Sequence, residues 1–340
     1  MKFQLPDGDY LITGGAGYLG GLCAKRLLEV LNDSRIIIID NLSKGRLKTI
    51  KKLLSLKSSS SLKFIRADVG QPEDYQFIFK THQIRAVFHF AGLIEVGESI
   101  KKPKKYFLNN AVKPEKLLQT MIKHHCRNII FSSTASVYGL PRYLPIDETH
   151  PTKPFNPYGI SKLAFEKILL KFQKEFKLNF IAFRYFNAAG AAEDGTLGEN
   201  HSPETHLIPN ILLNLKSDQP VKVFGHNYPT PDGTCIRDYI HVADLIEAHL
   251  LGIQQLLQKK TSRENFINLG SGHGCSILEV IKTAEKVTGR PVPFKFEKRR
   301  RGDVPVLVAS NQLAQKILGW GQKLKNLEEI IASTWQWHSQ

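Results

Sequence analysis

The sequence of 340 residues predicts an α/β protein, a doubly wound parallel sheet with a smaller C-terminal lobe. Short apolar runs alternate with helical patterns over about the first 190 residues, which calls for parallel strands joined by right-handed crossovers. Beyond that point the sequence breaks into pieces rich in glycine and proline. The length fits one large α/β unit with a smaller partner.

The predicted elements follow from these patterns in chain order. The first strand is 10–13; a loop of spaced glycines follows it, and leucines at helical spacing then predict a helix. A second buried strand, 36–39, ends at Asp40. Later apolar runs predict strands at 62–65, 86–90, 129–131, 180–183, 221–224 and 266–269, and apolar periodicity predicts helices near 242–257 and 276–288.

The predicted division of the chain places residues 1–190 in the large domain, with 226–265 contributing to it, and 191–340 in the smaller, interleaved lobe. One segment falls outside the regular pattern. Residues 44–63 are basic and rich in serine, with Ser58 to Ser61 at the tip, and they predict an exposed excursion between the second and third strands.

Composition excludes several classes of protein. Hydrophobic residues make up 42% and charged residues 23%, which is typical of a globular chain. Neither an apolar run long enough for a membrane span nor a cleavable leader is evident, so we expect a cytoplasmic protein. The four cysteines form no CxxC pair, so we predict neither a metal site nor disulfides. The formal net charge of +16 comes from scattered residues, so no nucleic-acid partner is expected.

The glycines at positions 14, 17 and 20 indicate a dinucleotide-binding loop. They follow the first strand and open the first helix, where a backbone must turn tightly and approach a pyrophosphate closely. Amides at the helix start then face the anion. The acid at the end of the second strand, Asp40, completes this context. The fold class is therefore Rossmann-type.

Asp40 also bears on the choice of dinucleotide. A carboxylate there accepts hydrogen bonds from ribose hydroxyls and repels a 2′-phosphate, which favours NAD over NADP. Lys44 and Arg46 follow closely and would suit the phosphate instead. Asp68 and the run 90–92 end later strands at the same edge of the sheet, where they are candidate neighbours of the adenine and the pyrophosphate.

Tyr158 and Lys162 are four residues apart on one face of a predicted helix, so their side chains are neighbours. A free tyrosine titrates near ~10, and a nearby cation together with a positive nicotinamide ring would favour the phenolate. A tyrosine shifted in this way can act as a general base. Upstream, the strand at 129–131 ends in hydroxyl residues, of which Thr134 is the first choice to hydrogen-bond a substrate oxygen, with Ser132 and Ser133 as alternatives.

These motifs together resemble the extended short-chain dehydrogenase/reductase superfamily, most closely its UDP-galactose 4-epimerase family. The resemblance runs over nearly the whole chain and is carried by TGGAGYLG at 13–20, DNLS at 40–43, FAGL and VGES at 90–99, FSSTASVYG at 131–139, PYGISK at 157–162, RYFNAAGA at 184–191, DGTCIRDYIHV at 232–242, NLGSG at 268–272 and RRGDVP at 300–305. RYFNAAGA and the run through RDYIHV are specific to the epimerase branch.

The resemblance implies inversion at C4 of a UDP-hexose, UDP-glucose or UDP-galactose, with tightly held NAD and Tyr158 as the base. It implies that Thr134 hydrogen-bonds the 4-oxygen and that Lys162 contacts the nicotinamide ribose. It implies NAD binding by Gly14, Gly17, Tyr18, Leu19, Gly20, Asp40, Asn41, Asp68, Val69, Phe90, Ala91, Gly92, Asn109, Ser132, Tyr158, Lys162 and Tyr185. It implies that the UDP-sugar is bound by Thr134, Asn187, His206, Leu207, Phe224, Arg237, Tyr239, Arg300, Asp303 and Leu307.

Four residues depart from the pattern that this resemblance sets. Ile94 stands where the family usually has a lysine that reaches the cofactor, and His206 replaces an asparagine that touches the diphosphate. Pro114 lies inside the expected interface helix of a homodimer and predicts a kink there. Leu307 is intermediate between the bulky and the small residues that exclude or admit N-acetylated sugars.

Three alternatives remain open from sequence. A 4,6-dehydratase has Asp-Glu directly after the threonine, whereas Ala135 and Ser136 stand here, which argues against dehydration. An epimerase of another UDP-sugar, such as an N-acetylhexosamine, a pentose or a uronate, would use the same machinery. A non-catalytic sensor of NAD or nucleotide-sugar would have no need of Tyr158 and Lys162.

Overall fold

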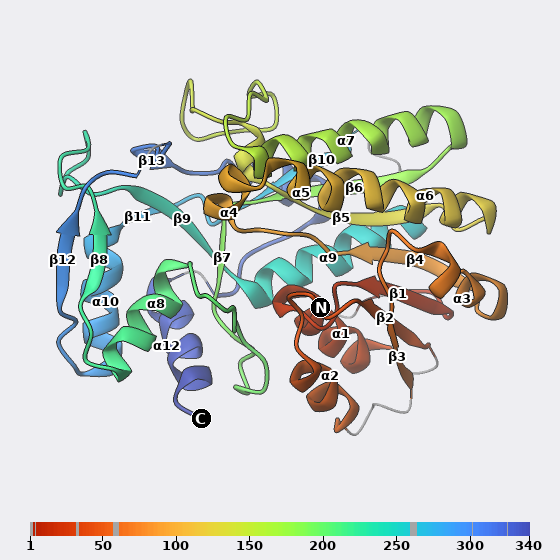
Figure 1. Ribbon diagram of the computed structural model, residues 1–340, viewed down its shortest axis with the longest axis horizontal. Helices are drawn as coiled ribbons and strands as arrows, with labels where there is room; N and C mark the ends of the chain where they lie inside the picture. The colour runs from red at the N-terminus through yellow and green to blue at the C-terminus, as the bar shows by residue number, and fades with distance from the viewer. Residues whose placement is uncertain are drawn as a thin grey trace.

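A parallel sheet forms the centre of the protein (Figure 1). The computed structural model describes residues 3, 5–31, 34–56, 61–258, 264–300, 302–324 and 326–340. Within these residues the sheet has seven strands in the order β10-β6-β5-β4-β1-β2-β3. Their bounds are β1 Asp9–Thr13, β2 Ile36–Asp40, β3 Leu62–Arg66, β4 Ile84–His89, β5 Asn128–Thr134, β6 Asn179–Tyr185 and β10 Phe266–Leu269. The strand order reverses between β1 and β4, which is the expected ligand site of a doubly wound sheet.

Helices cover both faces of this sheet because alternate strand residues point to opposite sides. On one face, residues such as Ile12 and Ile38 pack against the first set of helices, and on the other, residues such as Leu11 and Ile37 pack against the second. The first set is α1 Tyr18–Val30, α2 Leu47–Leu54, α9 Val242–Leu257 and α11 Gln312–Leu318. The second is α3 Gln76–Thr81, α6 Lys113–Lys123 and α7 Pro157–Phe176. The predicted strands and the Rossmann-type class are confirmed.

The smaller lobe has its own apolar core, formed by three helices with the short strands beside them. In Figure 1 it lies beyond the end of the large sheet where the chain leaves β6. Its sheet is built around β9 Ile236–His241, which pairs with β7 Asn187–Ala189, β11 Gly274–Ser276 and β13 Val306–Leu307. Its remaining elements are β8 Val221–Phe224, β12 Phe294–Glu297, α8 Leu207–Lys216, α10 Ile277–Thr288 and α12 Leu327–His338. The domain boundary at residue 190 stays a prediction.

The prediction of an exposed excursion over 44–63 is wrong for its first half. The structure forms α2 there, and Ile50 and Leu53 are fully buried against the large sheet. The lysines that made this segment look solvated occupy the other side of an amphipathic helix. The predicted serine tip lies outside the described residues, apart from Ser61.

The chain around Pro114 contains a π-helical turn. After α4 Val96–Lys101, a single helical run comprises α5 Pro103–Phe107, the π turn Leu108–Val112 and α6. Proline removes a backbone donor and clashes with the carbonyl four residues earlier, and the wider π turn gives that carbonyl room. The disturbance expected at Pro114 therefore takes the form of a π turn directly before it. Asn110 in this turn is buried, and its side chain holds both the amide and the carbonyl of Leu93.

A buried ion pair joins α7 to the sheet. Arg184 on β6 donates to both carboxylate oxygens of Glu166 on α7, at 2.7 and 3.0 Å. Ser133 donates to the same carboxylate, and Tyr138 accepts from Arg184 and donates to Asn268 on β10. Every charge in the network is met by a partner, which is the condition for tolerating buried charge.

Candidate active site

The glycine loop adopts the conformation that its spacing predicts. Gly14 has a φ of +76°, and a Cβ there would lie 2.6 Å from the amide nitrogen of Ala91. A Cβ on Gly20 would collide with the carbonyl oxygen of Gly14. Only glycine allows the loop to pass this close to the neighbouring strand ends. The loop leads into α1, whose first-turn amides face the cavity described below.

Asp40 is held at the end of β2 by two backbone amides, those of Ala16 and Leu42, at 3.0 and 2.8 Å. Burial raises the pKa of its carboxyl group, and the two amides partly offset that shift. The cations considered for a 2′-phosphate are engaged elsewhere: Lys44 pairs with Glu95 at 2.8 Å, and Arg46 donates to the carbonyl of Asn200. This arrangement favours ribose hydroxyls over a 2′-phosphate as the partner of Asp40.

Asp68 connects three segments at the same edge of the sheet. Its carboxylate accepts from Asn41 at 2.8 Å, from Lys113 at 2.7 Å and from the amide of Gly70. Partial burial opposes ionisation, but these hydrogen bonds outweigh it and lower the pKa of Asp68. An ionised acceptor thus lies beside Asn41 and Val69 on the cavity wall.

Tyr158 lies in the first turn of α7. Pro157 occupies the first helical position, and Asn156 caps the helix by accepting from the amide of Gly159 at 2.7 Å. The tyrosine hydroxyl hydrogen-bonds Thr134 at the end of β5. One turn further along, Lys162 is 2% exposed and donates to the carbonyl oxygen of Ser132 at 2.8 Å.

Burial shifts the pKa of both Tyr158 and Lys162, and the expectation of a phenolate at Tyr158 stays a prediction. Burial raises the pKa of Tyr158 to about 12, against the hydrogen bond from Thr134, which lowers it. Burial also lowers the pKa of Lys162 to about 7, against the nearby charge of Glu166. Both shifts have the same cause, because burial penalises the charged form of each side chain. That expectation also includes the positive charge of a bound nicotinamide ring, which favours the phenolate form of Tyr158.

The far end of the site carries arginines and an aspartate. Asp303 lies 3.9 Å from the guanidinium of Arg237 and accepts from Arg300 at 3.0 Å. Arg237 is anchored by two backbone carbonyls, those of Ile236 and Val304. Two guanidinium groups beside one carboxylate leave a net positive charge, which suits a diphosphate.

Nearly all of the predicted site residues line one continuous cavity of about 1690 Å³. The predicted residues that line it are Gly14, Gly17, Tyr18, Leu19, Gly20, Asp40, Asn41, Asp68, Val69, Phe90, Ala91, Gly92, Asn109, Ser132, Thr134, Tyr158, Tyr185, Asn187, His206, Leu207, Arg237, Tyr239, Arg300, Asp303 and Leu307. Its volume exceeds the usual range for one drug-sized ligand, so it has room for two nucleotide ligands. Ile94 lines the same cavity.

Two predicted site residues do not line this cavity. Lys162 lies behind its wall, where a Cβ on Gly92 would be 3.2 Å from the ammonium nitrogen. Phe224 ends β8 and lies under the guanidinium of Arg300, 4.6 Å from the ring centroid. Both residues contact the lining of the cavity from behind. Lys162 donates to Ser132, and the ring of Phe224 packs against Arg300.

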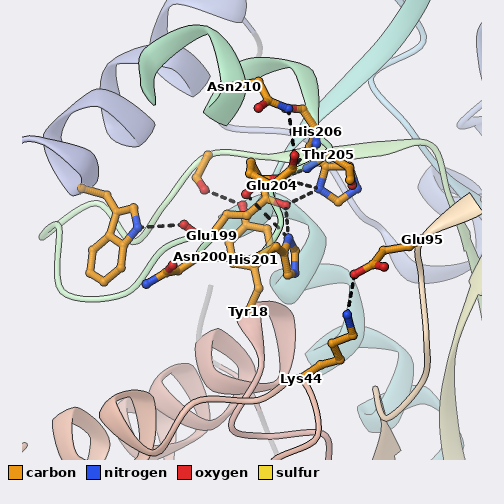
Figure 2. A network of polar contacts seen from close by, with 12 residues as sticks. Tyr18, Lys44, Glu95, Glu199, Asn200, His201, Glu204, Thr205, His206 and Asn210 are labelled. Atoms are coloured by element: carbon orange, nitrogen blue, oxygen red, sulfur yellow. Dashed lines mark hydrogen bonds and ion pairs between the residues drawn. The ribbon is translucent and has the colours of Figure 1, made fainter. Parts of the chain in front are cut away.

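Sequence reasoning missed three neighbours of His206, of which Glu199 and His201 line the cavity. Glu199, His201 and Glu204 gather around His206 directly before α8 (Figure 2). Burial opposes the charge on His201, but Glu199 and Glu204 outweigh it and raise the pKa of His201 to about 9. Burial likewise opposes ionisation of Glu199, and the two histidines lower its pKa to about 2. The spacing E-x-H-x-x-E-x-H was the available signal.

A family model for the NAD dependent epimerase/dehydratase family matches residues 10–270. The chain belongs to this family. The matched residues include the glycine loop, the helix that carries Tyr158, and Arg237 on β9. No helix among the described residues has the length and apolarity needed to cross a membrane.

Individual relatives match over nearly their whole length. The chain is 44% identical to a UDP-glucose 4-epimerase of Halalkalibacterium halodurans over 97% of this chain and 95% of that protein. A UDP-glucose-4-epimerase structure from Stenotrophomonas maltophila, with bound NAD and formylated UDP-arabinopyranose, superposes with a TM-score of 0.92 at 35% identity, covering 98% of each chain. A UDP-glucose 4-epimerase from Bifidobacterium longum, in complex with NAD+ and UDP, gives 0.89 at 37% identity over 97% of this chain and 98% of that one.

Proposed function

We propose that this protein is a UDP-glucose/UDP-galactose 4-epimerase, which inverts C4 reversibly through a 4-keto sugar with bound NAD. One observation carries the proposal. A single cavity joins a dinucleotide-binding glycine loop, a tyrosine with a hydroxyl partner, and a positively charged diphosphate site. The named relatives support the same reaction.

The residues at the cofactor end fit NAD. Gly14, Gly17 and Gly20 line the cavity without side chains, and Asp40 offers its carboxylate to ribose hydroxyls. Asn41 and Val69 line the adenosine end, and Gly92 lines the cavity in front of Lys162. When bound, NAD supplies the group that accepts a hydride from the sugar and returns it.

Tyr158 acts on the proton of the 4-hydroxyl group. Its phenol oxygen removes this proton as the sugar is oxidised and gives a proton back on reduction. Thr134 hydrogen-bonds the tyrosine hydroxyl and lines the same wall, so its own hydroxyl can hold the 4-oxygen. Lys162 lies one helical turn from Tyr158 and adds positive charge when protonated, which favours the phenolate.

The arginine end holds the nucleotide part of the substrate. Arg237 and Arg300 bind the diphosphate, and Asp303 orients both guanidinium groups. Asn187, His206, Leu207 and Tyr239 complete the walls of this end. A sugar anchored only through its UDP can present either face to the cofactor, which C4 inversion requires.

The test is conversion of UDP-galactose to UDP-glucose by the purified protein, without and then with added NAD, followed by chromatography. Tyr158→Phe should reduce the rate by roughly 10²–10⁴-fold, because it removes only the general base. Tyr143→Phe is the matched control, since that hydroxyl is exposed and hydrogen-bonds Asp147. Absence of conversion with NAD supplied would refute the hexose assignment.

We also propose a homodimer that uses the surface of α4, α5, the π turn and α7, which pack side by side. Large apolar side chains are exposed there, at Ile100, Phe107, Leu108, Val112, Ile160 and Leu170. Light scattering coupled to gel filtration should give twice the chain mass of 38.4 kDa. A monomer at micromolar concentration would contradict it.

The four unpaired cysteines support a reducing, cytoplasmic location.

A further inference from the structure

Four side chains of metal-ligating type converge in the segment before α8. Glu199, His201, Glu204 and His206 each offer one atom, and these atoms all lie within 4.8 Å of one another. Glu199 Oε1 contacts Nδ1 of His206 and lies 2.9 Å from Nδ1 of His201. Figure 2 shows the two imidazole rings and the two carboxylates turned toward a common point.

The carboxylates of this cluster are deeply buried. The side chain of Glu199 is 1% exposed and that of Glu204 is 6% exposed. Glu204 Oε2 has no hydrogen-bond partner, although it is shielded from water and lies 3.9 Å from Nδ1 of His201. Leaving such an oxygen without a hydrogen bond is costly, so its position inside the cluster points to a ligand that it would contact directly.

We infer that Glu199, His201, Glu204 and His206 form a binding site for one divalent transition-metal cation, with Zn²⁺ the best match. Two imidazole nitrogens and two carboxylate oxygens suit zinc in a four-coordinate site, whereas calcium and magnesium prefer oxygen ligands alone. Ligands at about 2.1 Å from a metal lie up to ~4 Å apart, so the observed spacing needs only small side-chain shifts. Two carboxylates neutralise the charge of the ion.

The cluster also has an entry path and a supporting neighbour. A separate cavity of about 190 Å³ reaches His201 and Glu204 from the side of α12, and Lys52 and His338 line it. On the other side, the ring of Tyr18 meets His201 edge-on at 6.4 Å. A metal would therefore join the segment before α8 to the glycine loop through Tyr18.

A bound metal would fix His206 in one tautomer. Coordination through Nδ1 leaves the proton on Nε2, so the ring keeps a donor. His206 lines the large cavity, and this donor would be present at any pH at which the metal is bound. This consequence rests on the proposed function, but the metal site itself does not.

The experiment measures metal binding rather than turnover. Protein stripped with a chelator is titrated with ZnCl₂ in competition with a chromophoric chelator, and thermal unfolding is followed by circular dichroism. We expect one equivalent of zinc per chain and a rise in Tm. Glu204→Gln and His201→Gln should each bind at least tenfold more weakly, with no rise in Tm.

The matched control is His273→Gln, which removes an exposed histidine outside the cluster and should bind zinc like the wild type. Far-UV circular dichroism checks the fold of each variant. The zinc stoichiometry of the wild type tests the proposal even if a variant does not fold. Less than one equivalent in the wild type, or equal affinity in Glu204→Gln and His201→Gln, would overturn the proposal. The cluster would then be a network of ion pairs only.

Discussion

Thr134 is the residue that lowers the pKa of Tyr158. Its hydrogen bond lowers a pKa that burial raises to about 12. The phenolate is the form that accepts a proton, so any loss of this hydrogen bond moves the base further from neutral pH. Burial lowers the pKa of Lys162 to about 7, so its charge changes near neutral pH.

Thr134→Val should therefore change the pH dependence of the reaction as well as its rate. We expect kcat to fall by roughly 10- to 100-fold, the range for a lost hydrogen bond to a charged group. The acidic limb of the pH profile should move to higher pH, because the pKa of Tyr158 rises. Thr134→Ser should restore both. A fall in kcat with an unchanged profile would show that Thr134 only positions the substrate.

At the scale of elements, the glycine loop is the part of the site that tolerates substitution least. Gly20→Ala would drive a Cβ against the carbonyl of Gly14, and backbone atoms cannot swing aside as side chains do. We expect NAD affinity to fall by at least tenfold and Tm to drop. Gly321→Ala is the control, because a Cβ there meets nothing within 4 Å. Equal NAD affinity in the two variants, measured by calorimetry, would contradict this account.

Local patterns explain which elements could be predicted. Apolar runs such as 36–39 and the glycine loop carry their own signal, so the large sheet and cofactor end followed from sequence. The helix α2 was not predicted, because a helix of 8 residues gives little apolar periodicity and its lysines made the segment look solvated. Arg237 and Asp303 come from distant segments, so only resemblance placed them together. The Glu and His cluster lies in a segment without helix, strand or cysteine, so neither periodicity nor cysteine spacing marks it.

At the scale of the whole molecule, buried histidines make the fold sensitive to acid. His241 and His249 are at most 1% exposed, and burial lowers the pKa of each to about 4. His89 is buried in the same way, and its pKa falls to about 3. The unfolded chain binds protons at these residues below about pH 6.5 and the folded protein does not, so their contribution to stability falls from pH 6.5 toward pH 4.

His241→Asn tests this effect because asparagine can keep the cap on α9 that His241 provides through the amide of Ala243. Between pH 7 and pH 5, the wild type should lose about 2 kcal/mol more unfolding free energy than the variant, from ~1.4 kcal/mol per pH unit. Urea unfolding at both pH values measures the difference. Parallel losses in the two proteins would mean that His241 is protonated in the folded state.

The buried pair of Glu166 and Arg184 has a consequence for how this sequence can diverge. Replacing either partner alone leaves an uncompensated charge beneath α7, at a cost of about 3–5 kcal/mol, a large share of the stability of an ordinary domain. Exchanging both for apolar residues is far less costly. Neutral drift at these two positions must therefore proceed by coupled replacements, and a library of single variants should be depleted at both positions while selected double variants survive.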